Sequence, residues 1–379
     1  MSVRFLTAVS GRAFNMRDRF GREIDYMRIS VIDSCNLNCY YCNPQDNNKK
    51  CQAINILSVK KVLCIVRAAT RIGITHFRLT GGEPLLHPQI DEMVSQIKKI
   101  PGVRSVSLTT NAVLLAQHAK QLKEAGIDSI NVSLDTIDAS EYEHITKKPL
   151  LDKVEHGIDD TIECGIRVKI NAVLTPQTDV VALTRYASKK GTDIRFIEMM
   201  PVGEGHTNGV EPYKKVIGTL SELYGEPYHV NTGKTKEINS GYNKYKEERK
   251  NPDNGPAEYY IFPELDIRVG LIQAIHGKFC DTCNRIRVTA DGRLMPCLGS
   301  SVTMDLVHDS CAFTDDLEKD FVIVQALKAA IKAKPGCHNF NDNAVTYTKT
   351  TETKTVETKA TELKAAEVNA ARNMSRIGG

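Results

Sequence analysis

Apolar residues between positions 27 and 200 form short β-rich runs that alternate with longer stretches of helical periodicity. The runs predict six strands, at residues 27–33, 75–80, 103–110, 128–134, 167–173 and 192–198. Residues 58–73 separate the first two runs and place apolar side chains at helical spacing, namely Val62, Ile65, Val66, Ala69 and Ile72. Strand–helix–strand alternation implies parallel strands with right-handed crossovers. The expected fold class is therefore α/β, a partial (β/α)6 barrel.

The pattern changes after the sixth run. A polar stretch at 231–256 leads into a strand-like run, PAEYYIF, and then into a group of cysteines. We expect a small C-terminal iron–sulfur domain here, followed by a short helix at 315–334. A Lys/Glu repeat at 349–367 has a five-residue period and no apolar stripe, so it predicts a solvated, partly helical linker. The expected organisation is a barrel at 1–210, a C-terminal domain at 211–340 and a tail at 341–379.

Composition and charge exclude several classes of protein. The 379 residues are 41% apolar and 25% charged, which is ordinary for a soluble protein. No apolar run reaches the roughly 20 residues that a membrane-spanning helix needs, and the N-terminus lacks the pattern of a signal peptide. The net charge of +4 is too small to indicate nucleic-acid binding. We expect a cytoplasmic protein that binds neither nucleic acid nor membrane.

The cysteines point to metal chemistry. The chain has 11, an odd number without an export signal, so a disulfide framework is not expected. Three form a C-x3-C-x2-C group, Cys35, Cys39 and Cys42. Three more form a C-x2-C-x13-C group, Cys280, Cys283 and Cys297. The other five are read as structural or incidental, namely Cys51, Cys64, Cys164, Cys311 and Cys337.

The first triad can hold three corners of a [4Fe–4S] cluster. Soft thiolates suit such clusters, and three ligands for four irons leave one iron open to a small molecule. A zinc site is the alternative, and it needs a fourth ligand. Cys51, His76 or His87 could supply that ligand. The spacing favours the cluster.

Neighbouring residues sharpen this interpretation. Tyr41 precedes the third cysteine, and a Gly-Gly-Glu-Pro sequence at 81–84 follows the second predicted strand. In this order and position the motifs resemble the radical S-adenosylmethionine (SAM) enzymes. The resemblance implies that SAM chelates the open iron and is cleaved reductively to a 5′-deoxyadenosyl radical. It also implies cluster ligation by the first triad and cofactor contacts by Tyr41, Gly82, Ser133 and Met200.

The second triad again offers three ligands, which indicates a second cluster with an open iron. Arg285 and Arg287 alternate along an extended segment beside it, so they share one face. Two guanidinium groups there would suit a polyanion such as a triphosphate. The plainer alternative is a pair of solvated surface arginines.

Two longer segments narrow the resemblance. Residues 20–36 (FGREIDYMRISVIDSCN) and 279–298 (FCDTCNRIRVTADGRLMPCL), with the terminal Gly-Gly, resemble the GTP 3′,8-cyclase family of molybdenum cofactor biosynthesis. The resemblance implies hydrogen removal at C3′ of GTP, attack of the ribose radical on C8, and 3′,8-cyclo-7,8-dihydro-GTP as product. The second cluster would bind the guanine edge. The implied GTP contacts are Arg28, Arg78, Thr109, Lys169, Arg285 and Arg287, and the implied catalytic residues are Arg285, Arg287, Gly378 and Gly379.

The resemblance also implies partners. They are an electron donor and a downstream enzyme that forms the cyclic pyranopterin, and the family allows a homodimer. Three residues depart from the family pattern: Ser34 replaces an Arg, His76 a Lys, and Ala112 a Gly.

Two other functions are compatible with parts of the sequence. Another two-cluster radical enzyme, one that modifies a peptide, would usually carry a longer C-terminal cysteine array than this chain has. A non-catalytic protein, with zinc at both sites or with clusters that only pass electrons or sense oxygen, would leave the Gly-Gly-Glu-Pro loop without a role. Turnover of GTP against peptide, and the content of acid-labile sulfide, separate these alternatives.

Overall fold

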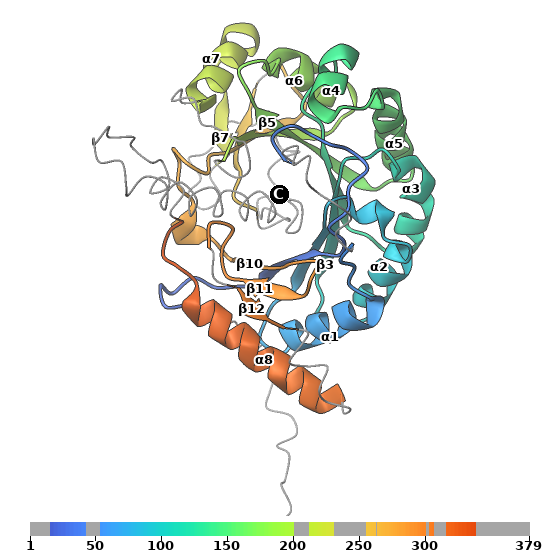
Figure 1. Cartoon of the computed structure of the whole chain (residues 1–379). Helices are drawn as coiled ribbons and strands as arrows, with labels where there is room; N and C mark the ends of the chain where they lie inside the picture. Colours follow the sequence, from blue (N-terminus) through green and yellow to red (C-terminus); the bar gives the residue numbers. More distant parts are fainter. Residues whose placement is uncertain are drawn as a thin grey trace, which may run out of the picture.

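A computed structural model of the chain describes residues 16–42, 54–200, 212–230, 255–262, 264–300, 303–306 and 316–338. Its strands are β1 (Tyr26–Ser30), β2 (His76–Thr80), β3 (Ser105–Thr110), β4 (Ser129–Ser133), β5 (Arg167–Leu174), β6 (Asp193–Glu198), β7 (Tyr228–Val230), β8 (Glu258–Ile261), β9 (Arg268–Ile272), β10 (Arg285–Val288), β11 (Arg293–Met295) and β12 (Met304–Asp305). They form one sheet in the order β12-β11-β10-β1-β2-β3-β4-β5-β6-β9-β8-β7. The sheet curves around a central space (Figure 1).

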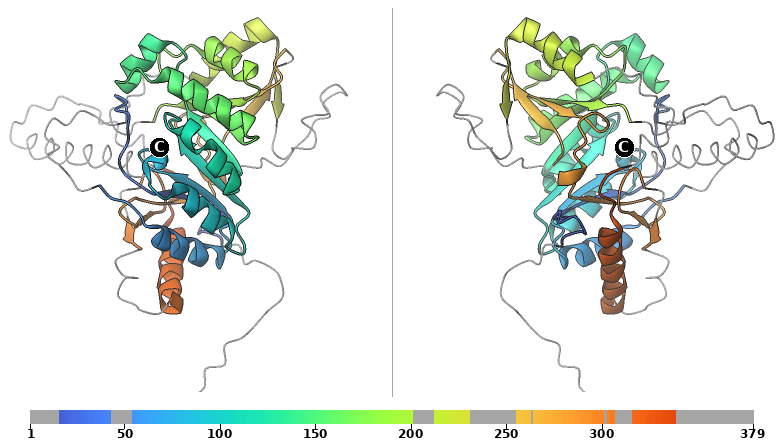
Figure 2. Two further views of the ribbon diagram at one scale, coloured as in Figure 1. Left: turned by 90° about the vertical axis from the view of Figure 1, so that its right-hand side faces the viewer. Right: turned by 90° about the vertical axis from the view of Figure 1, so that its left-hand side faces the viewer.

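The helices of the described residues are α1 (Val59–Thr70), α2 (Ile90–Lys98), α3 (Leu115–Glu124), α4 (Ala139–Thr146), α5 (Leu151–Glu163), α6 (Val180–Lys189), α7 (Pro212–Tyr224) and α8 (Asp316–Ala333), with the 3₁₀ turns η1 (Pro84–Leu86) and η3 (Cys280–Thr282). Side-chain caps start several of them. Ser58, Asp138 and Asp179 each accept a hydrogen bond from a backbone N–H of the first helical turn. Helices α1 to α6 cover the outside of the curved sheet, and α8 crosses below it (Figures 1 and 2).

The six strands expected from the sequence are all present, within one to three residues at their ends. Neighbouring pairs from β1 to β6 are parallel, as the strand–helix–strand pattern predicts. The α/β barrel class is therefore confirmed. The helices expected at 58–73 and 315–334 are α1 and α8.

The C-terminal strands extend both edges of the barrel sheet. β10 pairs in parallel with β1, and β9 pairs in parallel with β6. Antiparallel strands follow on each side, β11 and β12 next to β10, and β8 and β7 next to β9. The strands of the expected C-terminal domain thus belong to the same hydrogen-bonded sheet as the barrel strands. The domain boundary at 211 stays a prediction.

The chain forms a hairpin after β10: it turns at 289–292 and returns as β11. Gly292 takes a left-handed φ of 83° in this turn. Thr289 N–H donates to the carbonyl of Arg293 at 2.8 Å and closes the hairpin. The hairpin brings Cys297 back toward Cys283.

Alternation along the strands separates the core from the barrel interior. On β1 and β2, Met27, Ile29, Phe77 and Leu79 are fully buried on the helix-covered side. The intervening positions carry polar side chains that point inward, such as Arg78. The same alternation continues around the barrel, so the apolar core lies between sheet and helices, and the interior is left polar. In the described residues no helix has the length and hydropathy to cross a membrane.

Two helical glycines offer a test of this packing. A Cβ on Gly157 in α5 would lie 2.8 Å from the carbonyl oxygen of Ala112 and 3.0 Å from Cβ of Leu115, whereas one on Gly218 in α7 meets nothing within 4 Å. Overpacking predicts that Gly157→Ala lowers the free energy of unfolding by about 1–3 kcal/mol. Gly218→Ala should raise it by about 1 kcal/mol through helix propensity. Denaturant unfolding of the metal-free protein measures both, and equal effects would contradict the close approach at α5.

Candidate active site

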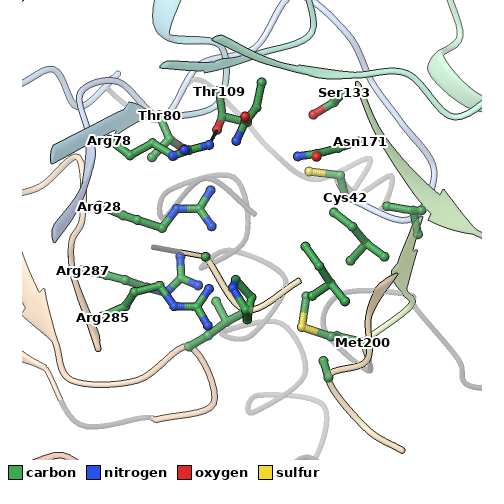
Figure 3. Close-up of a pocket in the computed structure, with 18 of the residues that line it drawn as sticks. Arg28, Cys42, Arg78, Thr80, Thr109, Ser133, Asn171, Met200, Arg285 and Arg287 are labelled. Carbon is green, nitrogen blue, oxygen red and sulfur yellow. Dashed lines mark hydrogen bonds between the residues drawn. The ribbon is translucent and has the colours of Figure 1, made fainter. Parts of the chain in front are cut away.

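A cavity of about 530 Å³ opens at the carboxyl ends of the parallel strands, where barrel enzymes place their chemistry. All six cysteines of the two triads line it. Arg28, Arg78, Arg285 and Arg287 enter from one wall, and Ser133, Asn171, Cys42 and Met200 enter from the opposite wall (Figure 3). Two motifs more than 230 residues apart in sequence therefore face a single space.

The loop that carries the first triad follows β1 and is fastened to α4. Asn38 N–H donates to the carbonyl of Thr146 at 3.0 Å, and Tyr40 N–H to that of Ile145 at 3.2 Å. Cys42 N–H donates to the carbonyl of Cys39 at 3.0 Å, and both cysteines line the cavity. Backbone hydrogen bonds thus hold the loop against the end of α4.

Asp135 ties the same loop to the strand ends. The Tyr41 hydroxyl donates to Asp135 Oδ2 at 2.5 Å, and Val173 N–H donates to Asp135 Oδ1 at 2.8 Å. Burial, together with the charge of Asp135, raises the pKa of Tyr41 well above its ordinary value. Tyr41 therefore stays a phenol and works as a fixed donor. Its hydroxyl has a protein partner, and the residue lines the cavity.

The two glycines at 81 and 82 are required by the backbone of the cysteine loop. A Cβ on Gly81 would lie 2.4 Å from the carbonyl oxygen of Ile32, and one on Gly82 would lie 2.2 Å from that of Ser34. Gly82 N–H donates to the carbonyl of Ile32 at 2.8 Å. Gly82 also lines the cavity. The close approach of the two loops explains the glycines, and the cofactor contact at Gly82 stays a prediction.

Glu83 joins the ends of β2 and β3 from a buried position. Its Oε1 accepts from Leu85 N–H at 3.0 Å and from the Thr110 hydroxyl at 2.7 Å, and its Oε2 accepts from Asn111 N–H at 2.7 Å. Asn111 Nδ2 in turn approaches Cys35 Sγ at 3.7 Å. A single carboxylate thus sets the position of the residue beside the first cysteine. From the sequence, Glu83 was identified only as a member of the Gly-Gly-Glu-Pro motif.

Ala112 adopts a left-handed conformation, with φ at 65°, in the turn after β3. A left-handed residue with a Cβ costs roughly 1–2 kcal/mol, which glycine avoids. The turn keeps its shape because Ala112 N–H donates to the Thr110 hydroxyl at 3.0 Å. The departure from glycine therefore places a Cβ in a left-handed conformation that glycine adopts without strain.

Strand pairing sets three arginines side by side. Arg287 on β10 lies directly opposite Arg28 on β1, and Arg28 lies directly opposite Arg78 on β2. Arg285 stands two residues before Arg287 on the same face, as the alternation predicts. Arg78 Nη1 donates to the Thr109 hydroxyl at 3.5 Å and Nε donates to the Tyr26 hydroxyl. The alternative of solvated surface arginines is wrong for Arg287, which is buried.

The electrostatics of this row follow from its crowding. Burial and the neighbouring charge of Arg287 depress the pKa of Arg28 well below its ordinary value. Burial and Arg285 lower the pKa of Arg287 to about 10. The carboxylates that line the cavity among the described residues are Asp33 and Asp135. Asp33 accepts from Asn55 at 2.6 and 3.0 Å, so it too is engaged elsewhere.

The second triad lies beside the arginines. Burial opposes ionisation of Cys283, but the charges of Arg285 and Lys334 outweigh it and bring the pKa of this thiol down to about 6. In the first triad, burial raises the pKa of Cys35 to about 11. Burial also raises the pKa of Cys280, so within the second triad Cys283 is the thiol whose ionisation the neighbouring cations favour.

The donor set fits two iron–sulfur clusters. Each triad supplies three thiols to the wall of the cavity. No group of three His, Cys, Asp or Glu side chains in the described ranges could hold a single metal ion as it stands. A cubane does not need such convergence, because each thiolate binds its own iron.

The remaining predicted residues fall into three groups. Thr109, Ser133 and Met200 line the cavity. Lys169 does not line it: the side chain is fully buried on β5, where burial and the charge of Arg195 lower its pKa to about 5. Gly378 and Gly379, the Lys/Glu repeat, Cys51 and Cys311 lie outside the described residues.

Sequence reasoning missed several residues of the cavity wall. Arg195 lines it and donates from Nε to Asn171 Oδ1 at 2.8 Å. A Cβ on Gly270 would lie 2.7 Å from Arg195 Cγ, so this glycine on β9 makes room for the arginine. The inward side of the strand alternation could have identified Asn171 and Arg195. Nothing local marked Lys334, which lines the cavity from the end of α8.

Comparisons with known proteins agree with this geometry. Residues 29–183 match the family model of the radical SAM superfamily, and residues 192–340 match that of Molybdenum Cofactor Synthesis C. The GTP 3′,8-cyclase of Clostridium perfringens (strain SM101 / Type A) is 35% identical over 330 residues, which cover 86% of this chain and 95% of that protein. The GTP 3′,8-cyclase of Alkaliphilus oremlandii is 35% identical over 331 residues, covering 86% and 94%. The chain belongs to the GTP 3′,8-cyclase family.

Solved structures share the fold at low sequence identity. SuiB of Streptococcus suis, bound to its precursor peptide SuiA, has a TM-score of 0.56 and 16% identity, covering 82% of this chain and 67% of that one. The enzyme anSMEcpe with bound AdoMet has a TM-score of 0.51 and 17% identity, covering 81% and 83%. GTP 3′,8-cyclases thus share a barrel with other radical SAM proteins, a superfamily that uses an iron–sulfur cluster and SAM.

One departure from the GTP 3′,8-cyclase pattern now has a location. His76 begins β2 and stacks on Tyr26, with ring centroids 6.5 Å apart and an angle of 9° between the planes. Its Nδ1 lies 3.0 Å from the Thr75 hydroxyl and 3.8 Å from Asp25 Oδ2. His76 is not among the residues that line the cavity, whereas Tyr26 is. His76 therefore affects the cavity through the Tyr26 ring on which it stacks.

Glu83 gives a prediction for the metal-free protein. Burial raises its pKa from 4.5 to about 7, so between these pH values the folded chain holds a proton that the unfolded chain releases. The free energy of unfolding should therefore fall by up to about 3 kcal/mol as pH rises across that window, with no further contribution above pH 7. Glu83→Gln should remove this slope, whereas Glu92→Gln on the exposed side of α2 should retain it. Denaturant unfolding at several pH values decides, and an unchanged slope in Glu83→Gln would contradict the assignment.

Proposed function

We propose that this chain catalyses the first step of molybdenum cofactor biosynthesis, the conversion of GTP to 3′,8-cyclo-7,8-dihydro-GTP. The observation that carries the proposal is the row of arginines on β10, β1 and β2, set between two cysteine triads in one cavity. Family membership supports the same activity. Peptide modification finds no comparable support in this cavity, since an extended peptide has no need of a concentrated positive wall.

The charge of the arginine row calls for a polyanion. Two unit charges about one strand spacing apart, roughly 5 Å, repel by about 3 kcal/mol at an effective dielectric constant near 20. Arg28, Arg78 and Arg287 stand at successive strands with this spacing. A triphosphate offsets such repulsion and accepts several charge-assisted hydrogen bonds from guanidinium groups. Thr109 adds a hydroxyl next to Arg78.

Two [4Fe–4S] clusters and SAM would supply the radical chemistry: the first triad would hold the cluster that reduces SAM, and the second would hold the cluster near the guanine edge. The protein's own residues bind and orient. Asp135 and Tyr41 fix the loop of the first triad, and Glu83 and Asn111 fix its first cysteine. Ser133 and Met200 form the wall opposite the arginines (Figure 3). With the phosphates held at one wall, the ribose is presented toward the other, which is catalysis by placement.

The remaining parts of the proposal concern surroundings. A reductant must deliver the electron, and an enzyme that forms the cyclic pyranopterin must consume the product. Two oxygen-sensitive clusters favour a reducing compartment, so we propose a cytoplasmic location. A homodimer and a role for Lys169, Gly378 and Gly379 at the substrate remain part of the same proposal, supported by the family resemblance.

Anaerobic turnover tests the proposed function. The reconstituted protein is incubated with SAM, dithionite and GTP, and the nucleotides are separated chromatographically, because the product is an isomer of GTP with the same mass. A new isomer that forms only with both SAM and GTP is expected. Cleavage of SAM without any loss of GTP would contradict the assignment.

Cys35→Ala should abolish formation of 5′-deoxyadenosine, because the first cluster loses one of its three thiolates. Cys164→Ser, at the end of α5 and outside both triads, should leave the rate unchanged. Liquid chromatography of the SAM products measures both variants. Retained cleavage in Cys35→Ala would rule out the first triad as the radical-generating site.

Arg287→Ala should weaken GTP binding about tenfold to a hundredfold, the value of one or two hydrogen bonds to a charged group. Arg293→Ala is the matched control, because Arg293 lies on the neighbouring strand with 55% of its side chain exposed. Calorimetric titration of GTP into the anaerobic enzyme gives both dissociation constants. Equal affinities in the two variants would exclude Arg287 from the phosphate site.

A further inference from the structure

Lys334 is a buried lysine with an unusual set of partners. It follows the last residue of α8, and 1% of its surface is exposed. Its Nζ donates to Cys283 Sγ at 3.5 Å, to the carbonyl oxygen of Arg285 at 2.8 Å and to that of Pro296 at 2.9 Å. An ammonium group has three N–H donors, and these three acceptors account for all of them.

The three acceptors lie on both halves of the second triad. Cys283 and Arg285 belong to the segment that enters β10, whereas Pro296 directly precedes Cys297 after β11. The β10–β11 hairpin connects these two segments only at its turn, which is the end away from the thiols. One ammonium group therefore links the Cys283 side to the Cys297 side at the end where the thiols stand.

A second cation fixes the end of α8 that carries Lys334. Arg22 Nη1 donates to the carbonyl of Cys280 at 2.6 Å, and Nη2 donates to that of Pro335 at 2.6 Å. Asp18 Oδ2 accepts from Arg22 Nε at 2.6 Å and holds the guanidinium in place. Arg22 thus binds both Cys280, the first cysteine of the second triad, and Pro335, the residue after Lys334. The position of Lys334 is set by the chain on both sides.

Burying an ammonium group is costly unless an anion or a full set of acceptors compensates for it. Two carbonyl oxygens and Cys283 Sγ accept hydrogen bonds from Lys334 Nζ. The sulfur of Cys283 is the one of these three acceptors that can carry a compensating negative charge. A hydrogen bond to a cluster thiolate also stabilises the more negative, reduced state of the cluster.

We infer that Lys334 is a positioning residue of the second cluster: it holds the two halves of the triad together and, through its N–H to Cys283 Sγ, raises the reduction potential of that cluster. The inference rests on the proposed function, because it requires that the second triad bind a [4Fe–4S] cluster. It concerns residues of the protein that do not ligate iron, and it needs no contact between Lys334 and GTP.

The test isolates the second cluster in the full-length chain by replacing Cys35, Cys39 and Cys42 with alanine. This background is compared with the same background carrying Lys334→Met, Lys334→Gln or, as control, Lys332→Met, because Lys332 is exposed on the same helix. After anaerobic reconstitution, iron and sulfide are counted, and the midpoint potential is measured by EPR-monitored redox titration. About four irons per chain in the background would establish the second cluster independently of Lys334.

With the cluster present, Lys334→Met should lower the reduced-to-oxidised ratio at a given potential about tenfold, which is a shift of about 59 mV for a one-electron couple. Lys334→Gln keeps an N–H donor without the charge and should shift the potential less, in the same direction. Lys332→Met should match the background. Loss of the cluster in Lys334→Met, with an unfolding transition retained, would also support the positioning role.

An unchanged iron content together with an unchanged potential in both Lys334 variants would overturn the inference. If Lys334→Met does not fold, Lys334→Gln decides by the same two measurements. A background protein that binds no iron–sulfur cluster at all would instead contradict the proposed function, so the two failures are distinguishable.

Discussion

Mutual repulsion among arginines at the junction of β10, β1 and β2 is the constraint on which the site depends. Parallel pairing forces Arg287, Arg28 and Arg78 into neighbouring positions. A fold that only needed a stable sheet would place apolar residues there, as it does on the opposite face with Met27 and Phe77. The positive wall therefore destabilises the empty site, and in the proposed function the triphosphate of GTP relieves this repulsion.

The same junction brings the two triads into one cavity. Because β10 pairs in parallel with β1, the cysteines before β10 and after β11 lie at the amino end of β1, whereas the first triad follows its carboxyl end. The cavity between them is lined by both triads. The two sites are supported in opposite ways. Carboxylates, Glu83 and Asp135, fasten the first loop through neutral hydrogen-bond donors. Cations, Arg22 and Lys334, fasten the second.

Local patterns were sufficient for much of the fold and for the ligands. The six barrel strands followed from β-rich runs, and the two triads followed from cysteine spacing. The shared face of Arg285 and Arg287 followed from period-two alternation. Long-range pairing was beyond local reasoning, because the register of Arg28 with Arg287 joins residues 259 positions apart. Lys334 and Arg22 escaped notice for the same reason, since their partners at the second triad are backbone carbonyls and one thiol from distant segments. For Lys169 the family resemblance indicated a contact with GTP but not the surroundings of the side chain. Only the packing around β5 shows that the side chain is fully buried.

The most direct measurement follows a single hydrogen atom. GTP carrying deuterium at C3′ is incubated anaerobically with the reconstituted enzyme, SAM and dithionite, and the 5′-deoxyadenosine is analysed by mass spectrometry. If the cavity holds GTP between the two triads with its ribose toward the SAM side, the recovered 5′-deoxyadenosine will be one mass unit heavier. Unlabelled 5′-deoxyadenosine formed at the same rate with and without GTP would show that the radical does not meet the ribose, and would contradict the assignment of this cavity.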